Sequence, residues 1–267
     1  MLLRNVFAKT LRDLRWPTFW AALALFAIAG YFTLLYPTYS STFNLQEIID
    51  QLPPAMKAVI GGQFIDISSA TGFLNIELFP MFLPAILGGY AIALGSGLTA
   101  AEESRGTIDV LLSYPIARWR LVTEKSVAVV ISVALVAAGL WIGASVGAAA
   151  SASELATDRV AAGLVHAWAL ALDFGALALL LAAWRGNRSA AVGVAVAVLV
   201  VMYFINALAP IIDALDSIRG ASLFYWYTRG DPLKNGLAGT DVALLLVVAI
   251  VLFALSLVAF ERRNLSA

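Results

Sequence analysis

The stretch EESRGTIDVLLSYPIARWRLVTEK, residues Glu102 to Lys125, is charged and lies between two long apolar runs. Gly106 and Thr107 interrupt the helix that enters it, and Pro115 ends the next one, because the residue before a proline is pushed away from helical angles. Apolar residues between these breaks recur on one helical face. The sequence therefore predicts a helix of about two turns, lying across a membrane surface between two spans. The apolar residues of this short helix are Ile108, Leu111 and Leu112.

The composition of the chain places it in a membrane. Hydrophobic residues make up 61% of the 267 residues, charged residues make up 13%, and the mean hydropathy is +0.89. These values far exceed what the core of a soluble domain requires. Six runs reach the roughly 20 residues that a helix needs to cross the hydrocarbon layer, and their continuous apolar character favours helices over barrel strands. We expect a single all-α membrane domain over residues 1–267. Its predicted spans are Pro17–Tyr36, Leu78–Ala101, Ser126–Ala149, Val160–Ala183, Ser189–Ala209 and Asp241–Phe260.

The distribution of Lys and Arg predicts the orientation. The segments on the amino-terminal side of the membrane hold twelve of the 17 basic residues, and the segments on the opposite side hold five. No basic residue is left in a predicted membrane core. The positive-inside rule then places both termini, and the stretch from residue 102 to residue 120, in the cytoplasm.

The segments that flank the spans are also informative. Residues Leu2 to Arg15 predict an amphipathic helix in the inner membrane interface, the alternative being a basic flank that obeys the topology rule. Outer segments are expected at residues 37–77 and 210–240. The consecutive aromatic residues Phe224 to Tyr227 suit the outer headgroup layer. The run from Leu78 to Ala101 is rich in glycine, which predicts an interior helix or a subunit contact.

Three polar side chains within the apolar runs are candidates for a functional role. Asp173 and His166 are seven residues apart, which places them on nearly one helical face at an axial distance of about 10 Å. A carboxyl group inside a membrane is costly, so Asp173 has two open interpretations: a functional group, or a protonated or hydrogen-bonded group that fixes helix packing. His166 is better explained as an interface residue than as a proton carrier. Asn206 is the other main polar exception.

Several chemistries are not supported by the sequence. The chain has no GxxxxGK[ST] phosphate loop, and it has one His and no Cys. Glu102, Glu103 and Arg105 approach the EExxxR motif of prenyl-protein proteases, but the spacing is wrong by two residues. A rhomboid GxSG motif and a metal-ligand set are both missing. A net charge of zero gives no reason to expect nucleic acid. We therefore expect neither an enzyme nor a resident cofactor.

The charged stretch and the six-span layout resemble the membrane subunits of ABC exporters of the second permease type, which have the type V exporter fold. The family pattern is a Glu-rich turn, Gly-Thr, a Leu-rich helix, Ser-x-Pro, and basic residues that lead into the third span. Ser104 stands where a third acidic residue is frequent, and Asp109 stands where Glu is usual. The matching residues are Glu102, Glu103, Arg105, Gly106, Thr107, Leu111, Leu112, Ser113, Pro115, Arg118 and Lys125.

This resemblance implies a multi-pass permease subunit in the inner (plasma) membrane, coupled to separate nucleotide-binding subunits that hold ATP and Mg. It also implies a second permease copy, identical or paralogous. Residues 106–113 would be the coupling helix and residues 2–15 the connecting helix, with Ile108 and Arg118 among the contacts to the ATPase. Asp173 and Asn206 are candidates for the substrate path, and hydrophobic or amphipathic cargo is favoured. The alternative is a mechanotransmitting subunit that acts on an outer partner without transport.

Overall fold

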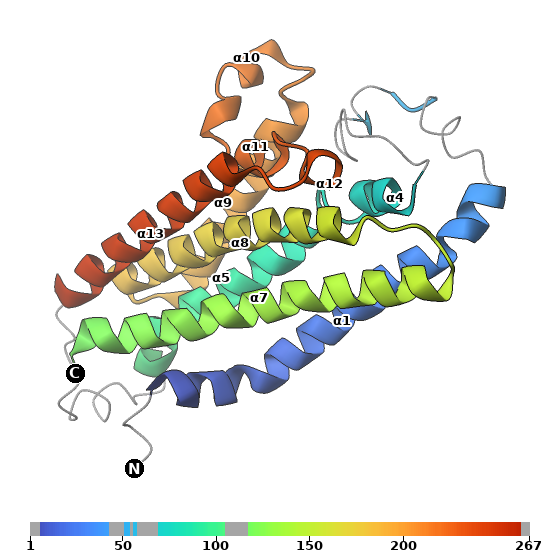
Figure 1. The fold of residues 1–267 in the computed structure, drawn as a ribbon. Coiled ribbons are helices and arrows are strands. Elements are labelled where there is room, and N and C mark those ends of the chain that lie inside the picture. Colours follow the sequence, from blue (N-terminus) through green and yellow to red (C-terminus); the bar gives the residue numbers. More distant parts are fainter. Residues whose placement is uncertain (1–5, 43–50, 54–55, 58–68, 105–116, 263–267) are drawn as a thin grey trace.

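The computed structural model describes residues 6–42, 51–53, 56–57, 69–104 and 117–262. Within these residues the chain is helical and contains no strand. Six of the helices are long and apolar enough to cross a membrane, and each coincides with one of the six predicted runs. They are α1 (Val6–Thr42), α5 (Phe82–Ser104), α7 (Arg118–Ala150), α8 (Thr157–Arg185), α9 (Arg188–Leu208) and α13 (Gly239–Arg262) (Figure 1).

Helix α8 occupies the centre of the bundle. It packs against α5 and α13 along much of its length and also contacts α7 and α9. Its apolar window is 61% buried, compared with 22% for α1 and α13. The polar residues Asp173 and His166 therefore lie on the helix with the least access to lipid.

The two ends of the bundle differ. The first residues of α1 and the last residues of α13 lie at one end, which we call the terminal end (Figure 1). The opposite end, which we call the loop end, carries several short helices, among them α4, α10, α11 and α12 (Figure 1). Four of the five basic residues predicted to lie on the outer side belong to these short helices, to their flanks or to the start of α8. The short helices are α4 (Ala70–Glu77), α10 (Asp213–Asp216), η3 (Arg219–Ala221), α11 (Leu223–Thr228) and α12 (Pro232–Asn235).

Helix α1 joins two predicted segments. It runs from Val6 to Thr42 through Pro17 and Pro37 without a break, so most of the amphipathic segment predicted over residues 2–15 is continuous with the first span. Pro17 removes one backbone donor, and the adjacent Thr18 hydroxyl donates to the Leu14 carbonyl at 2.7 Å. Figure 1 shows α1 bending near its beginning. Proline therefore kinks this helix, as it often does in membrane spans, and does not end it.

Helices α1 and α7 approach each other closely because α7 carries glycine at every fourth position. A Cβ built on Gly143 would lie 2.7 Å from the carbonyl carbon of Phe26. Gly139 meets the backbone at Ala22 in the same way, and Gly147 meets the backbone at Gly30. This is the small-xxx-small packing that brings helices together in lipid.

Helices α5 and α8 meet in a similar way, which confirms the interior position predicted for the second span. A Cβ on Gly95 would lie 3.0 Å from the carbonyl carbon of Gly175. A Cβ on Gly175 would in turn lie 3.1 Å from Ala91. These two glycines hold the central helix against α5.

The aromatic run before α13 divides into two pairs. Phe224 and Tyr227 are buried in the core, and the Tyr227 hydroxyl donates to the Phe79 carbonyl at 2.7 Å. Tyr225 and Trp226 are only partly buried, and Arg229 lies over both rings. Phe224 and Tyr227 therefore contact the protein core and not lipid, whereas Tyr225 and Trp226 are left for the headgroup layer that the sequence predicts for this run. Because α11 is helical, residues three apart share a face, and that face is turned toward the core.

Candidate functional site

The predicted contact with a soluble ATPase falls largely outside the described residues. Glu102 and Glu103 belong to the last turn of α5, and Arg118 is the first residue of α7. The predicted coupling helix itself, with its flanking residues, remains a prediction from the sequence. The residues outside the described part are Arg105, Gly106, Thr107, Ile108, Leu111, Leu112 and Pro115.

The first turns of α7 are tied to both neighbouring helices at the terminal end. Glu124 accepts hydrogen bonds from the backbone N–H of Phe7 on α1 at 3.2 Å and from Arg120 at 2.8 Å. The buried Lys125 ammonium donates to the carbonyl of Leu98 on α5 at 3.3 Å. The start of α7 is therefore joined by hydrogen bonds to both α1 and α5.

A cluster of three hydroxyl groups joins the same helices deeper in the bundle. The Thr18 hydroxyl lies 2.6 Å from that of Ser132 and 2.9 Å from that of Tyr90, and the last two are 2.7 Å apart. Thr18 donates to Leu14, so it accepts from one of the other two hydroxyls. Buried hydroxyls in lipid need partners, and each of these finds them on two other helices. Sequence reasoning missed this cluster, since its members are single hydroxyls on three different spans.

Asp173 and His166 are both fully buried on α8. The Nδ1 atom of His166 lies 2.9 Å from the Ala162 carbonyl. A carbonyl can only accept, so Nδ1 carries a proton and donates it. Nε2 and both carboxylate oxygens of Asp173 have no hydrogen-bond partner among the described residues. The helix thus places two unsatisfied polar groups on one face, as the seven-residue spacing predicts, without bringing them into contact with each other.

Asn206 is engaged on both sides of its amide group. Its Nδ2 atom donates to the Thr228 hydroxyl at 3.2 Å, and its Oδ1 atom accepts from Arg219 at 3.1 Å. The side chain therefore fastens the short helices of the loop end to the end of α9. A role for Asn206 in the substrate path stays a prediction.

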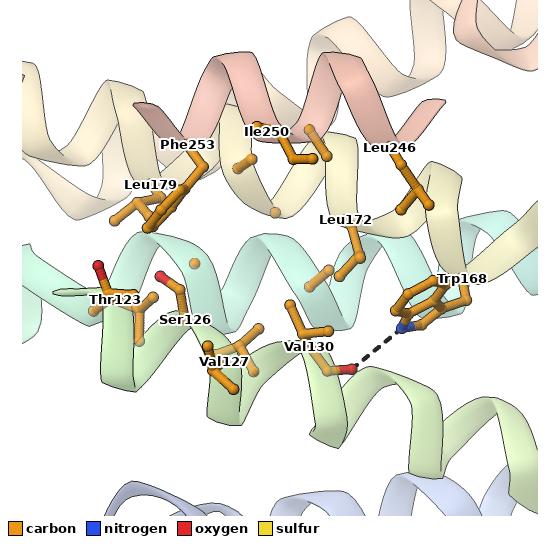
Figure 2. Close-up of a pocket in the computed structure, with 17 residues that line it drawn as sticks. Thr123, Ser126, Val127, Val130, Trp168, Leu172, Leu179, Leu246, Ile250 and Phe253 are labelled. Atoms are coloured by element: carbon orange, nitrogen blue, oxygen red, sulfur yellow. Dashed lines mark hydrogen bonds between the residues drawn. The ribbon is translucent and has the colours of Figure 1, made fainter. Parts of the chain in front are cut away.

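A cavity of about 300 Å³ lies between α5, α7, α8 and α13. Figure 2 shows Thr123 and Ser126 at one end of it and Trp168 at the other, where the indole donates to the Val130 carbonyl at 3.2 Å. Nearly all of its lining is apolar. The hydroxyl oxygen of Ser126 has no hydrogen-bond partner among the described residues.

The comparison with protein families gives the decisive observation. The family model described as "ABC-2 family transporter protein" matches residues 4–265, which is nearly the whole chain. The chain belongs to this ABC-2 family. It is therefore a multi-pass membrane protein and a permease subunit of an ABC transporter, which works with ABC ATPase subunits. No curated protein and no solved structure matches the chain.

Membership in the ABC-2 family draws attention to the residues around the segment that leads from α5 to α7. The hydrogen bonds of Glu124 and Lys125 lie beside this segment. The sequence signal for the α1–α7 contact was present but was not used, because Gly139, Gly143 and Gly147 recur at four-residue intervals. The cavity had no such signal, since its lining comes from four helices that only the fold brings together.

Proposed function

We propose that this ABC-2 family permease is an exporter subunit, in which a short helix between α5 and α7 receives force from a partner ATPase. The partner would bind and hydrolyse ATP with Mg, and this chain would catalyse no reaction. The observation that carries the proposal is the charged stretch of residues 102–125, with Gly106 and Pro115 bounding an apolar stripe, in a chain of this family.

The physical requirement is a set of contacts whose energies differ between the ATP-bound and ATP-free states of the partner. Glu102, Glu103 and Arg105 would make polar contacts at the rim of the ATPase. The apolar face of the short helix would fill a groove, as amphipathic helices do in other complexes. Its residues are Ile108, Leu111 and Leu112.

The described residues around this segment support such a role because they form a stiff frame. Glu124 links α7 to α1, and Lys125 links α7 to α5. The hydroxyl cluster of Thr18, Tyr90 and Ser132 repeats these links deeper in the bundle. Force applied between α5 and α7 would move three helices together, which is what a coupling element requires.

The remaining features of the proposal concern assembly and cargo. Two permease copies, identical or paralogous, would form the pathway in the inner (plasma) membrane, with both termini in the cytoplasm. The excess of basic residues at the terminal end supports this orientation. The apolar character of the spans favours hydrophobic or amphipathic cargo, with Asp173 as a polar group on the path.

The test compares two Leu→Asp variants in the complex with its ATPase. Leu111→Asp lies in the proposed coupling helix, and Leu237→Asp is an exposed control at the loop end. We expect both to insert into the membrane, while Leu111→Asp and Gly106→Pro abolish the ATP hydrolysis that cargo stimulates. ATPase activity and transport into inside-out vesicles are measured together. Unchanged transport in Leu111→Asp or Gly106→Pro contradicts the coupling role.

A further inference from the structure

The cavity between α7 and α13 opens toward the lipid. Two of its lining residues, Val127 on α7 and Ile250 on α13, are 45% and 64% exposed. Figure 2 shows them on opposite helices with the cavity between them. Both belong to membrane spans, so the medium at the opening is hydrocarbon. The cavity is therefore a side pocket of the bundle, open to the membrane.

The cavity lies in the half of the bundle that includes the terminal end. Thr123, at one end of the cavity, is in the second turn of α7, and Phe253 is near the end of α13. From Thr123 to Val130 the helix rises about 10 Å. The pocket thus extends from the membrane interface to about the middle of the hydrocarbon layer.

The chemistry of the lining selects an apolar occupant. Water needs two to four polar partners to stay in a buried site, and apolar cavities remain dry. An empty space of this size would forfeit dispersion contacts along its wall. A lipid chain at the opening fills the space with no loss of hydrophobic free energy, since it leaves one apolar medium for another.

The polar groups at the terminal end of the cavity suit the headgroup of the same lipid. Arg120, at the start of α7, is 60% exposed and uses its Nε atom to pair with Glu124, which leaves the rest of its guanidinium for a further anion. Arg262 is exposed at the end of α13. Trp119 is exposed beside them, as interfacial tryptophans are. Ser126 lines the cavity near this end, but its hydroxyl oxygen is buried, so the wall that an occupant meets there is apolar.

From this geometry we propose that the cavity binds one acyl chain of an anionic phospholipid. The chain extends from Ser126 toward Trp168, and the phosphate lies between Arg120 and Arg262. Charge-assisted contacts to phosphate distinguish this lipid from a neutral one of the same chain length. The site depends on neither the ATPase nor the transport cycle.

The chain has no cysteine, so a single introduced cysteine reports on one place. Ile250→Cys lies at the opening, and Val251→Cys is exposed on the next residue of the same helix but does not line the cavity. Each full-length variant is labelled with bimane and reconstituted in phosphatidylcholine vesicles that contain brominated phosphatidylglycerol or brominated phosphatidylcholine. Quenching of the bimane measures which lipid lies next to the label.

At position 250 we expect half-maximal quenching at a several-fold lower fraction of brominated phosphatidylglycerol than of brominated phosphatidylcholine. At position 251 the two lipids should quench equally. Ala176→Phe, which fills the cavity, should abolish the preference, whereas Ala134→Phe on the lipid-facing side of α7 should keep it. Arg120→Gln combined with Arg262→Gln should bring the ratio to about one without filling the cavity.

Equal quenching by the two lipids at position 250 would overturn the proposal. A preference that survives both Ala176→Phe and the double arginine variant would overturn it as well. Quenching by neither lipid at position 250, with normal quenching at position 251, would show that a second permease copy or cargo covers the opening, which also refutes lipid binding. Failure of the coupling test leaves these results unaffected, because the experiment uses the permease without its ATPase.

Discussion

The contact between α1 and α7 gives the sharpest prediction, because its geometry sets a magnitude. In Gly143→Ala the new Cβ would lie 2.7 Å from the Phe26 carbonyl carbon, whereas ordinary Cβ contacts begin at 3.4 Å. The difference between these distances requires the two helices to separate by at least about 0.7 Å, because the Phe26 carbonyl oxygen lies closer still. Neither backbone can yield locally, since Gly139 and Gly147 lie in the same contact.

Overpacking of this kind costs about 1–3 kcal/mol. The substitution also gains up to about 1 kcal/mol of helix propensity, which a control must remove. Gly193→Ala on α9 is that control, because a Cβ there meets nothing within 4 Å. The difference in unfolding free energy between the two variants then isolates the packing cost. We expect Gly193→Ala to be more stable than Gly143→Ala by about 2 kcal/mol.

The assay is thermal unfolding of the purified permease in detergent, followed by fluorescence. A change of about 1 kcal/mol shifts Tm by about 2–4 °C in a chain of this size, so Gly143→Ala should unfold about 4–8 °C below Gly193→Ala. Hydrogen exchange supplies a local readout. Exchange should accelerate in α1 and remain unchanged in α8, because α1 depends on α7 for most of its contacts. A Tm of Gly143→Ala equal to or above that of Gly193→Ala would refute the backbone contact.

Two further predictions concern acidic residues. Asp173→Asn keeps the shape of the side chain and removes its acidic group. If Asp173 belongs to the cargo path, this variant should lower cargo-stimulated ATP hydrolysis while Tm changes by less than about 2 °C. Equal losses of stability and activity would instead indicate a packing role. Burial raises the pKa of Glu77 at the end of α4, so folding favours the protonated form, and stability falls as the pH rises from the ordinary pKa of glutamate through the raised value. Glu77→Gln should flatten this part of the profile and raise Tm at neutral pH, which thermal unfolding from about pH 4 to pH 8 would check; an unchanged profile would contradict it.

The six spans were predictable because one property decides them. A run of about 20 apolar residues must cross the hydrocarbon layer as a helix, whatever packs beside it. The ends were less predictable. The sequence places the boundary between a surface helix and a span at Pro17, but membrane helices tolerate proline. Here α1 continues through Pro17 and packs along α7.

The candidate site was predictable only where a motif carries it. The charged stretch from Glu102 to Lys125 could be recognised within one segment of sequence. By contrast, the hydroxyl cluster joins residues as far apart as Thr18 and Ser132, and no local pattern distinguishes these hydroxyls from others. The role of Asn206 was equally hidden, since its partners Arg219 and Thr228 reach it only when the short helices fold back onto α9.

The two sides of α7 are packed differently, so we expect α7 to move more easily relative to α13 than relative to α1. Toward α1, glycines bring backbone against backbone, and such a contact can neither compress nor slide without breaking. Toward α13, the cavity leaves about 300 Å³ that is bounded by side chains and open to lipid. A displacement imposed at the start of α7 should therefore move α1 and α7 as one body, while the volume change is absorbed on the side of the cavity. A fluid acyl chain in that space would let α7 move against α13 at little cost, because it adapts its shape where a packed side chain would resist.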